Sequence, residues 1–220
     1  MAADGKTLSP GFNNTGVSAT AAPANVTLGS AKAVNGGIQV TWEKAANAAT
    51  YNVYRKGSGD TYWKVVSAKQ SGTSYTDKNV TAGSTYKYTV RGVAADGKTL
   101  SPGFNNTGVS ATAAPDRVTL VDAKLVTTGT KGIQVRWKST ANAPTYNVYR
   151  CANPPTDKNG NPAAVTSGWK LVGKQVKGLS FKDTAGQSGV TYAYTVRGVA
   201  ADGKTLSASY NTVGLRITMP

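Results

Sequence analysis

The fold of this chain follows from one repeated stretch, Ala2-Ala-Asp-Gly-Lys-Thr-Leu-Ser-Pro-Gly-Phe-Asn-Asn-Thr-Gly-Val-Ser-Ala-Thr-Ala-Ala-Pro23. The stretch returns unchanged from Ala94 to Pro115, 92 positions later, and a looser copy begins at Ala200. Two bodies of matching layout and roughly 100 residues each lie between the copies. This period indicates an array of whole domains, because solenoid repeats are only about 20–50 residues long.

Three copies of the stretch accompany only two bodies. We therefore expect residues 1–23 to be the closing strand of a preceding repeat, followed by one domain at 24–115 and a second at 116–220. The alternative, in which each body takes its closing strand from the segment before it, stays open at this point. The link Ala113-Ala-Pro-Asp116 is short and contains proline, which predicts restricted motion between the bodies.

Alternation of apolar and polar residues predicts strands in both bodies. In Ile38-Gln-Val-Thr-Trp42 the apolar residues share one face, and Thr85-Tyr-Lys-Tyr-Thr-Val-Arg91 places Lys87, Thr89 and Arg91 opposite its tyrosines. Further strands are expected at 26–28, 51–55, 62–66 and 73–77, and in the second body at 133–137, 146–150, 169–172 and 191–197. Short strands joined by turns predict an all-β chain of two tandem antiparallel Greek-key β-sandwiches.

The second body is the longer one, mainly because a hairpin loop at residues 151–168 is enlarged. Within this loop, Asp157-Lys-Asn-Gly-Asn161 has some likeness to a calcium-binding loop. Its glycine stands at the fourth position, however, whereas the calcium loop needs glycine at the sixth. We therefore predict a turn at Asn159–Gly160 and no metal site.

The basic charge does not have the pattern of a nucleic-acid site. The formal net charge is +15, but the 25 lysines and arginines are scattered singly along the chain. We expect a solubilising surface that can contact anionic cell-wall polymers, with no specific nucleic-acid binding. No apolar run is long enough for membrane insertion.

The residue types needed for catalysis are scarce. The chain has no histidine, a single cysteine at Cys151 and ten acidic residues placed in separate turns. No triad and no acid/base pair can be assembled from this set. We therefore expect a protein that is not an enzyme, with no catalytic, cofactor-binding or metal-binding residues.

Three aromatic positions in each body resemble those of fibronectin type III modules. The family places Trp on the second strand, Tyr on the third and Tyr near the start of the sixth. These positions are held by Trp42, Tyr51 and Tyr86 in the first body and by Trp137, Tyr146 and Tyr192 in the second. The resemblance implies the family's sandwich fold and a tyrosine corner at 80–86. The second body departs from the pattern with Gly186 in the place of Val80.

The residue sequence of the repeats resembles that of tandem repeats on surface proteins of gut Gram-positive bacteria. It is carried by Tyr51-Asn-Val-Tyr-Arg55, Thr73-Ser-Tyr-Thr-Asp77 and Tyr88-Thr-Val-Arg-Gly-Val93. The resemblance implies an extracellular protein of the bacterial cell surface that acts as an adhesin or a spacer. Some similar repeats bind immunoglobulin variable regions.

Aromatic and basic residues on one sheet face form the predicted partner-binding set. Tyr54 alternates with buried neighbours and should point outward, beside the strand that carries Arg91. Such residues dominate binding hot spots, although a stack of Tyr54 on Arg91 could also serve only to cover the sheet. The set comprises Tyr54, Tyr62, Trp63, Lys87 and Arg91 in the first body and Tyr149, Trp169 and Arg197 in the second.

Three functions stay open on the sequence. The leading hypothesis is a non-catalytic surface module that recognises a host protein, with immunoglobulin as the sharpest example. The second is a structural spacer or stalk, and the third is an accessory module of a polysaccharide-degrading enzyme. Exposed aromatics beside arginine favour binding, whereas the near-identity of the repeated stretch favours the spacer.

Overall fold

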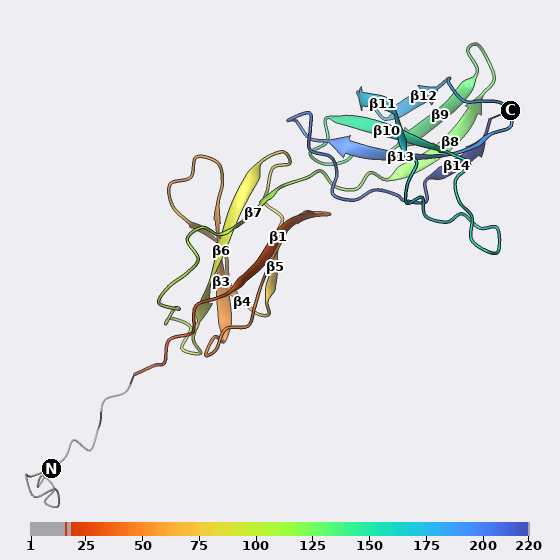
Figure 1. The fold of residues 1–220 in the computed structure, drawn as a ribbon. Coiled ribbons are helices and arrows are strands. Elements are labelled where there is room, and N and C mark those ends of the chain that lie inside the picture. Colours follow the sequence, from red (N-terminus) through yellow and green to blue (C-terminus); the bar gives the residue numbers. More distant parts are fainter. Residues whose placement is uncertain (1–15, 17–18, 220) are drawn as a thin grey trace, which may run out of the picture.

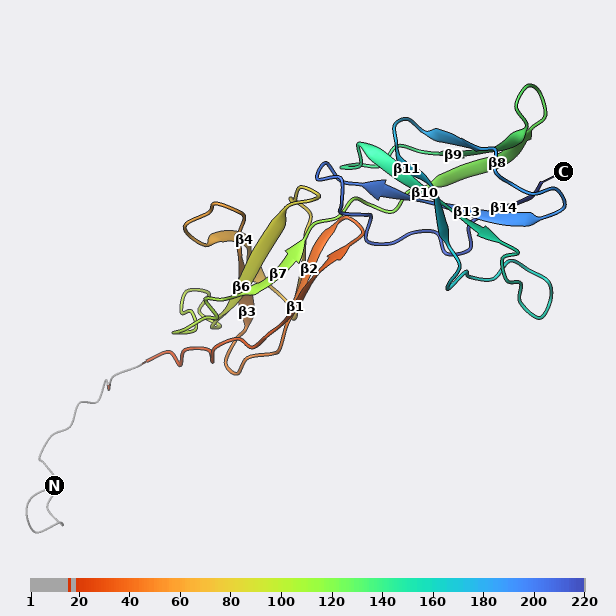
Figure 2. The ribbon, with the colours of Figure 1, turned by 45° about the horizontal axis from the view of Figure 1, so that its top comes forward.

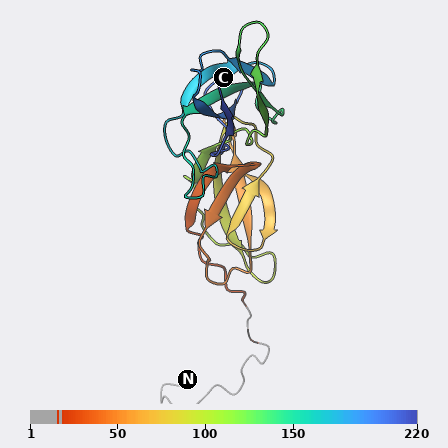
Figure 3. The ribbon, with the colours of Figure 1, turned by 90° about the vertical axis from the view of Figure 1, so that its right-hand side faces the viewer.

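The computed structural model describes residue 16 and residues 19–219, and these fold into two antiparallel β-sandwiches placed end to end (Figures 1 and 3). The predicted fold class is therefore confirmed. The part of the chain that is described contains no helix that could cross a membrane. Most of the predicted leftover strand at 1–23 lies outside the described residues, and the described residues among them, 16 and 19–23, are not in a strand.

Module 1 is the sandwich formed by β1 to β7. One sheet has the order β1-β2-β5 and the other β4-β3-β6-β7, with all pairs antiparallel. The strands are β1 Leu28–Val34, β2 Gly37–Trp42, β3 Thr50–Lys56, β4 Lys64–Gln70, β5 Ser74–Asp77, β6 Thr85–Val93 and β7 Val109–Thr112. Strand β7 belongs to the second copy of the repeated stretch, so this module is closed by the copy that follows it.

Module 2 repeats this topology with sheets β8-β9-β12 and β11-β10-β13-β14. Its strands are β8 Leu120–Val126, β9 Gly132–Trp137, β10 Thr145–Ala152, β11 Lys170–Val176, β12 Ser180–Asp183, β13 Thr191–Val199 and β14 Leu215–Thr218. The third copy of the stretch supplies β14 to this module. The loop between β10 and β11 projects from the sandwich in Figure 2.

Several predicted strand boundaries were wrong. Strand β1 starts at Leu28, so the predicted strand at 26–28 overlaps it at this residue alone. Strand β4 starts at Lys64, so Tyr62 and Trp63 lie in the preceding turn, where the Gly57 amide donates to the Asp60 carboxylate over 2.7 Å. Likewise β11 starts after Trp169. The side-chain hydrogen bond of Asp60 extends the turn beyond the predicted strand start, and alternation alone does not reveal such a bond.

Each core is built on the inward-facing residues that alternation selects. Ile38, Val40 and Val53 of module 1 have no exposed surface. The rings of Trp42 and Tyr51 meet edge to face with centroids 5.5 Å apart, and the Tyr51 hydroxyl accepts from the Ala45 amide over 3.0 Å. A buried aromatic pair of this kind stabilises the fold by more than the burial of its apolar area alone.

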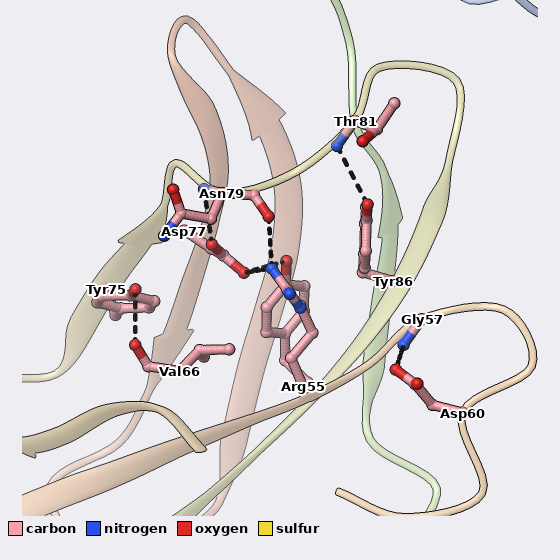
Figure 4. Close-up of polar contacts among 10 residues, drawn as sticks. Arg55, Gly57, Asp60, Val66, Tyr75, Asp77, Asn79, Thr81 and Tyr86 are labelled. Atoms are coloured by element: carbon pink, nitrogen blue, oxygen red, sulfur yellow. Dashed lines mark hydrogen bonds and ion pairs between the residues drawn. The ribbon is translucent and has the colours of Figure 1, made fainter. Parts of the chain in front are cut away.

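An ion pair joins the two sheets of each sandwich. Alternation in β3 turns Arg55 inward, where its Nη1 donates to the Asp77 carboxylate over 2.8 Å and to the Asn79 carbonyl over 2.7 Å (Figure 4). The Tyr88 hydroxyl donates to the same carboxylate over 3.1 Å. Burial and the neighbouring Asp77 charge raise the pKa of Tyr88, so this hydroxyl stays protonated and able to donate.

Both tyrosine corners are formed, including the one that lacks its valine. The Thr81 amide donates to the Tyr86 hydroxyl over 3.1 Å in module 1 (Figure 4), and the Gln187 amide donates to the Tyr192 hydroxyl over 2.9 Å in module 2. A Cβ on Gly186 would lie 3.3 Å from the Met219 sulfur. The methionine therefore fills the space left by the missing valine, whereas its counterpart in module 1 is the buried Ala113.

Because Met219 fills the space that a valine fills in module 1, we expect substitutions of Gly186 and Met219 to have non-additive effects on stability. We expect Gly186→Val to cost about 1–3 kcal/mol, because the added methyl groups crowd Met219. Met219→Ala should cost about 2–5 kcal/mol by opening a cavity. The double variant restores the combination of module 1 and should lose at least 1 kcal/mol less than the sum of the single variants. Hydrogen exchange of module 2 peptides in the full chain measures the loss of unfolding free energy in all three variants. Additive losses would contradict the idea that Met219 fills the space of the missing valine.

The link between the modules is tied to the module before it. The Arg117 amide donates to the Asn35 side chain over 2.7 Å, and the Gly36 amide donates to the Asp116 carboxylate over 2.5 Å. Residues 35 and 36 form the turn between β1 and β2, so module 1 holds the first residues of module 2. These two hydrogen bonds are a physical basis for restricted motion at the junction.

Candidate binding site

The outer face of the sheet β4-β3-β6-β7 carries a small pocket in module 1. Its walls are Tyr54, Trp63, Thr89, Arg91 and Phe104, and its volume is about 70 Å³. Strands β3 and β6 place Tyr54 opposite Thr89 in the hydrogen-bonded register. Trp63 enters from the turn before β4, and Phe104 from the connection between β6 and β7.

That connection explains why an outward-facing residue is buried. Residues 101–108 cross the outer face of β6, and the Thr89 hydroxyl donates to the Asn105 carbonyl over 2.8 Å. Thr89 is therefore 1% exposed although alternation places it with Lys87 and Arg91 on the solvent side. The Asn105 carboxamide in turn accepts from the amides of Thr107 and Gly108, each over 3.0 Å, which fixes the end of the crossing.

Arg91 is held inside this arrangement. Its Nε donates to the Ser101 carbonyl over 3.1 Å, and its Nη2 donates to the same oxygen. Its guanidinium lies 5.8 Å from the centre of the Phe104 ring. The predicted stack of Tyr54 on Arg91 is replaced by this contact with Phe104, because the connection places the phenylalanine over the arginine.

Module 2 carries an equivalent pocket of about 100 Å³, lined by Tyr149, Trp169, Thr195, Arg197 and Tyr210. The Arg197 guanidinium lies 5.4 Å from the centre of the Tyr210 ring, and its Nη2 donates to the Ser207 carbonyl over 2.6 Å. The rings of Trp169 and Tyr210 meet edge to face at 6.5 Å. Each of the five positions thus has the same place in both modules.

Six of the eight predicted residues line the two pockets, and two lie elsewhere. Tyr62 is 66% exposed outside the pocket, with the Lys64 ammonium 5.6 Å from its ring centre. Lys87 is exposed near the start of β6, opposite Lys56 and Ser110 in the sheet. Sequence reasoning missed Thr89 and Phe104 together with their counterparts Thr195 and Tyr210. The aromatic residue recurring inside the repeated stretch was a usable signal for Phe104.

The aromatic and basic lining of the two pockets suits binding by contact. Aromatic walls offer apolar surface and stacking, and an arginine already held by a carbonyl offers a fixed positive charge. Within residues 16 and 19–219, no three side chains of His, Cys, Asp or Glu are grouped so that they could hold a metal ion. The Asp157 carboxylate accepts from the amides of Asn159 and Asn161, each over 2.8 Å, which confirms the predicted turn in the enlarged loop.

Proteins that resemble the chain include a bacterial depolymerase and a chicken protein. No family model matches the chain. A stretch of 56 residues, 26% of this chain, is 46% identical to 10% of a poly(3-hydroxybutyrate) depolymerase from Ralstonia pickettii. The solved structure of the FN1–FN3 domains of chicken CNTN1 matches with a TM-score of 0.37 and 16% identity, over 90% of this chain and 68% of that one. The chain spans about a tenth of the curated relative that it matches.

Proposed function

We propose that this chain is a non-catalytic accessory part of an extracellular enzyme that degrades an insoluble polymer, and that it binds the polymer through its two aromatic pockets. The observation that carries the proposal is the repetition of one pocket, built from equivalent residues, on the same face of both modules. Two weak sites on one chain reinforce each other when the ligand repeats as a polymer does. The depolymerase likeness favours poly(3-hydroxybutyrate) as the first polymer to test.

Retention on suspended polymer tests this function. The chain of residues 1–220 is mixed with granules of poly(3-hydroxybutyrate), with cellulose or with chitin, and the bound fraction is measured at physiological and at raised salt. We expect retention on one polymer that survives raised salt. Retention that salt abolishes would reflect only the net charge of +15 and would contradict the proposal.

Matched tyrosine variants locate the binding face. Tyr54→Ala combined with Tyr149→Ala removes one wall from each pocket and should weaken retention about tenfold or more, equivalent to about 1.4 kcal/mol. Tyr62→Ala removes an exposed tyrosine outside the pocket and should leave retention unchanged. Equal losses in the two variants would overturn the assignment of the pockets. Circular dichroism spectra confirm that both variants are folded.

Two earlier hypotheses remain as competing outcomes. Nothing in the geometry or the comparisons favours immunoglobulin, so immunoglobulin retained from serum at raised salt, with no polymer bound, would replace the proposed partner. The spacer has a specific observation in its favour, the hydrogen bonds that tie Asp116 and Arg117 to the preceding turn. A chain that retains neither polymer nor protein at raised salt would favour that spacer function.

A further inference from the structure

The turn between β1 and β2 contains one of the two Asn-Gly pairs of the chain, Asn35–Gly36, and the second pair is Asn159–Gly160 in the enlarged loop. An Asn-Gly pair can deamidate without an enzyme, because glycine has no Cβ to hinder the attack of its amide nitrogen on the preceding side chain. Asn35 and Asn159 are both exposed, so water reaches each of them. The two pairs differ in how their reacting groups are held.

At the junction, both reacting groups of Asn35–Gly36 are hydrogen-bonded to module 2. The Gly36 amide donates to the Asp116 carboxylate over 2.5 Å, and the Asn35 side-chain oxygen accepts from the Arg117 amide over 2.7 Å. Deamidation begins with a ring closure that consumes the Gly36 N–H and turns the Asn35 carboxamide toward Gly36. The hydrogen bonds to Asp116 and Arg117 therefore oppose this closure, because it breaks the first and disturbs the second.

The pair in the enlarged loop lacks such a restraint on its asparagine side chain. The Gly160 amide donates to the Asp157 carbonyl over 3.0 Å, and the Asn159 backbone amide donates to the Asp157 carboxylate over 2.8 Å. None of the side-chain hydrogen bonds described in this turn involves the Asn159 carboxamide. The chain thus contains its own reference for an Asn-Gly pair that no second module holds.

We propose that Asn35 is a site of spontaneous deamidation that module 2 holds back while it is docked, and that conversion of Asn35 releases the junction. In the first step the Gly36 nitrogen bonds to the side-chain carbonyl carbon of Asn35. The bond from that carbon to the side-chain nitrogen breaks, and ammonia leaves with the Gly36 proton. Water then adds to one of the two ring carbonyl carbons and opens the ring, which leaves aspartate or isoaspartate at position 35.

Both products disturb the hydrogen bonds that tie the modules together. Aspartate at position 35 places a negative charge next to Gly36, whose amide holds the Asp116 carboxylate, and the two like charges repel. Isoaspartate adds one atom to the backbone of the two-residue loop, which is closed by the pairing of Val34 with Gly37. The turn then no longer presents Gly36 to Asp116. This site is separate from the two aromatic pockets and does not depend on the proposed binding function.

Ageing of the full chain at mildly alkaline pH measures the two conversions side by side. Mass spectrometry of the peptides that contain each pair follows the loss of Asn35 and of Asn159 over time. We expect Asn35 to be converted about fivefold or more slowly than Asn159 in the folded chain. In concentrated urea, where the modules are unfolded, the two pairs should be converted at similar rates. Equal rates in the folded chain would overturn the inference.

Matched variants of Asp116 test the role of module 2. Asp116→Ala removes the acceptor of the Gly36 amide and should speed the conversion of Asn35 about threefold or more. Asp116→Asn keeps an oxygen that can accept from this amide and should keep the conversion slow. Conversion of Asn159 is the internal control and should be the same in all chains. If Asp116→Ala leaves the conversion of Asn35 unchanged, or slows it as the loss of a base would, the inference is overturned.

Release of the junction is measured on converted chains. Asn159→Gln removes the second reactive pair, so that chains converted at position 35 can be separated from unconverted ones by their charge. Nuclear magnetic resonance then compares the hydrogen exchange of the Gly36 and Arg117 amides. We expect both amides to exchange faster after conversion, while the strands of both modules keep their protection. Unchanged exchange at both amides would overturn the release of the junction.

Discussion

Asp77→Ala is expected to remove about 3–5 kcal/mol from the free energy of unfolding of module 1, because it leaves the partly buried charge of Arg55 without its partner. The Asp77 side chain is 1% exposed and that of Arg55 is 21% exposed, so water can solvate the arginine only in part. The variant also removes the acceptor of the buried Tyr88 hydroxyl. Both losses act on the same module and in the same direction.

Hydrogen exchange of the full chain measures this effect within each module. Peptides of module 1 should lose protection in Asp77→Ala, while those of module 2, where Arg150 and Asp183 form the same pair over 2.8 Å, should keep it. Asp183→Ala should give the reverse pattern. The control is Asp122→Ala, which breaks the solvent-exposed pair with Arg136 and should change stability little. A loss for Asp77→Ala no larger than that of the control would contradict the role of the buried pair.

The inward orientation of Arg55 could have been predicted from the sequence. Tyr51, Val53 and Arg55 alternate, so the pattern that places Tyr51 and Val53 in the core also turns Arg55 inward, and Arg150 repeats it. The partner could not be assigned in the same way. Asp77 lies 22 residues further along on the opposite sheet, and its closeness depends on how the two sheets stack.

The strands and their faces were predictable because each depends on local periodicity. Alternation made the pocket residues on strands predictable, namely Tyr54, Arg91, Tyr149 and Arg197, and Trp63 and Trp169 were predicted although they lie just before their strands. Phe104 and Tyr210 belong to irregular connections, which are held where the Ser101 and Ser207 carbonyls accept hydrogen bonds from Arg91 and Arg197. Burial of Thr89 is a consequence of the same crossing and has no signature in alternation.

The effect of the enlarged loop could not be read from its sequence. From the sequence, residues 151–168 were predicted only to form an enlarged hairpin loop with a turn at Asn159–Gly160. The structure shows its physical effect, since Val165 and Cys151 form a small buried cluster with Ala193 under the loop. Ala193 replaces Lys87 of module 1 there, and Arg216 replaces Ser110 and donates to the Pro155 and Ala163 carbonyls over 2.8 and 2.7 Å. The substitutions and the insertion thus form one unit beside the pocket.

Gly37→Ala is expected to destabilise module 1 by about 3 kcal/mol or more, for two reasons that act together. Gly37 has a φ of 152°, a backbone conformation that disfavours a side chain. A Cβ at this position would also lie 2.1 Å from the Asp77 carbonyl oxygen, so the backbone of β2 or β5 would have to move. That movement would disturb the strand end that holds the Asp77 carboxylate against Arg55.

Two further glycine variants separate the causes. Gly72 has a φ of 80° and open space around its Cβ position, so Gly72→Ala should show only the conformational cost of about 1–2 kcal/mol. Gly132 is the counterpart of Gly37 in module 2, where a Cβ would lie 2.5 Å from the Asp183 carbonyl oxygen. Gly132→Ala should therefore destabilise module 2 by steric crowding. If hydrogen exchange shows that Gly37→Ala costs no more than Gly72→Ala, the close approach of β2 to Asp77 does not constrain the sandwich.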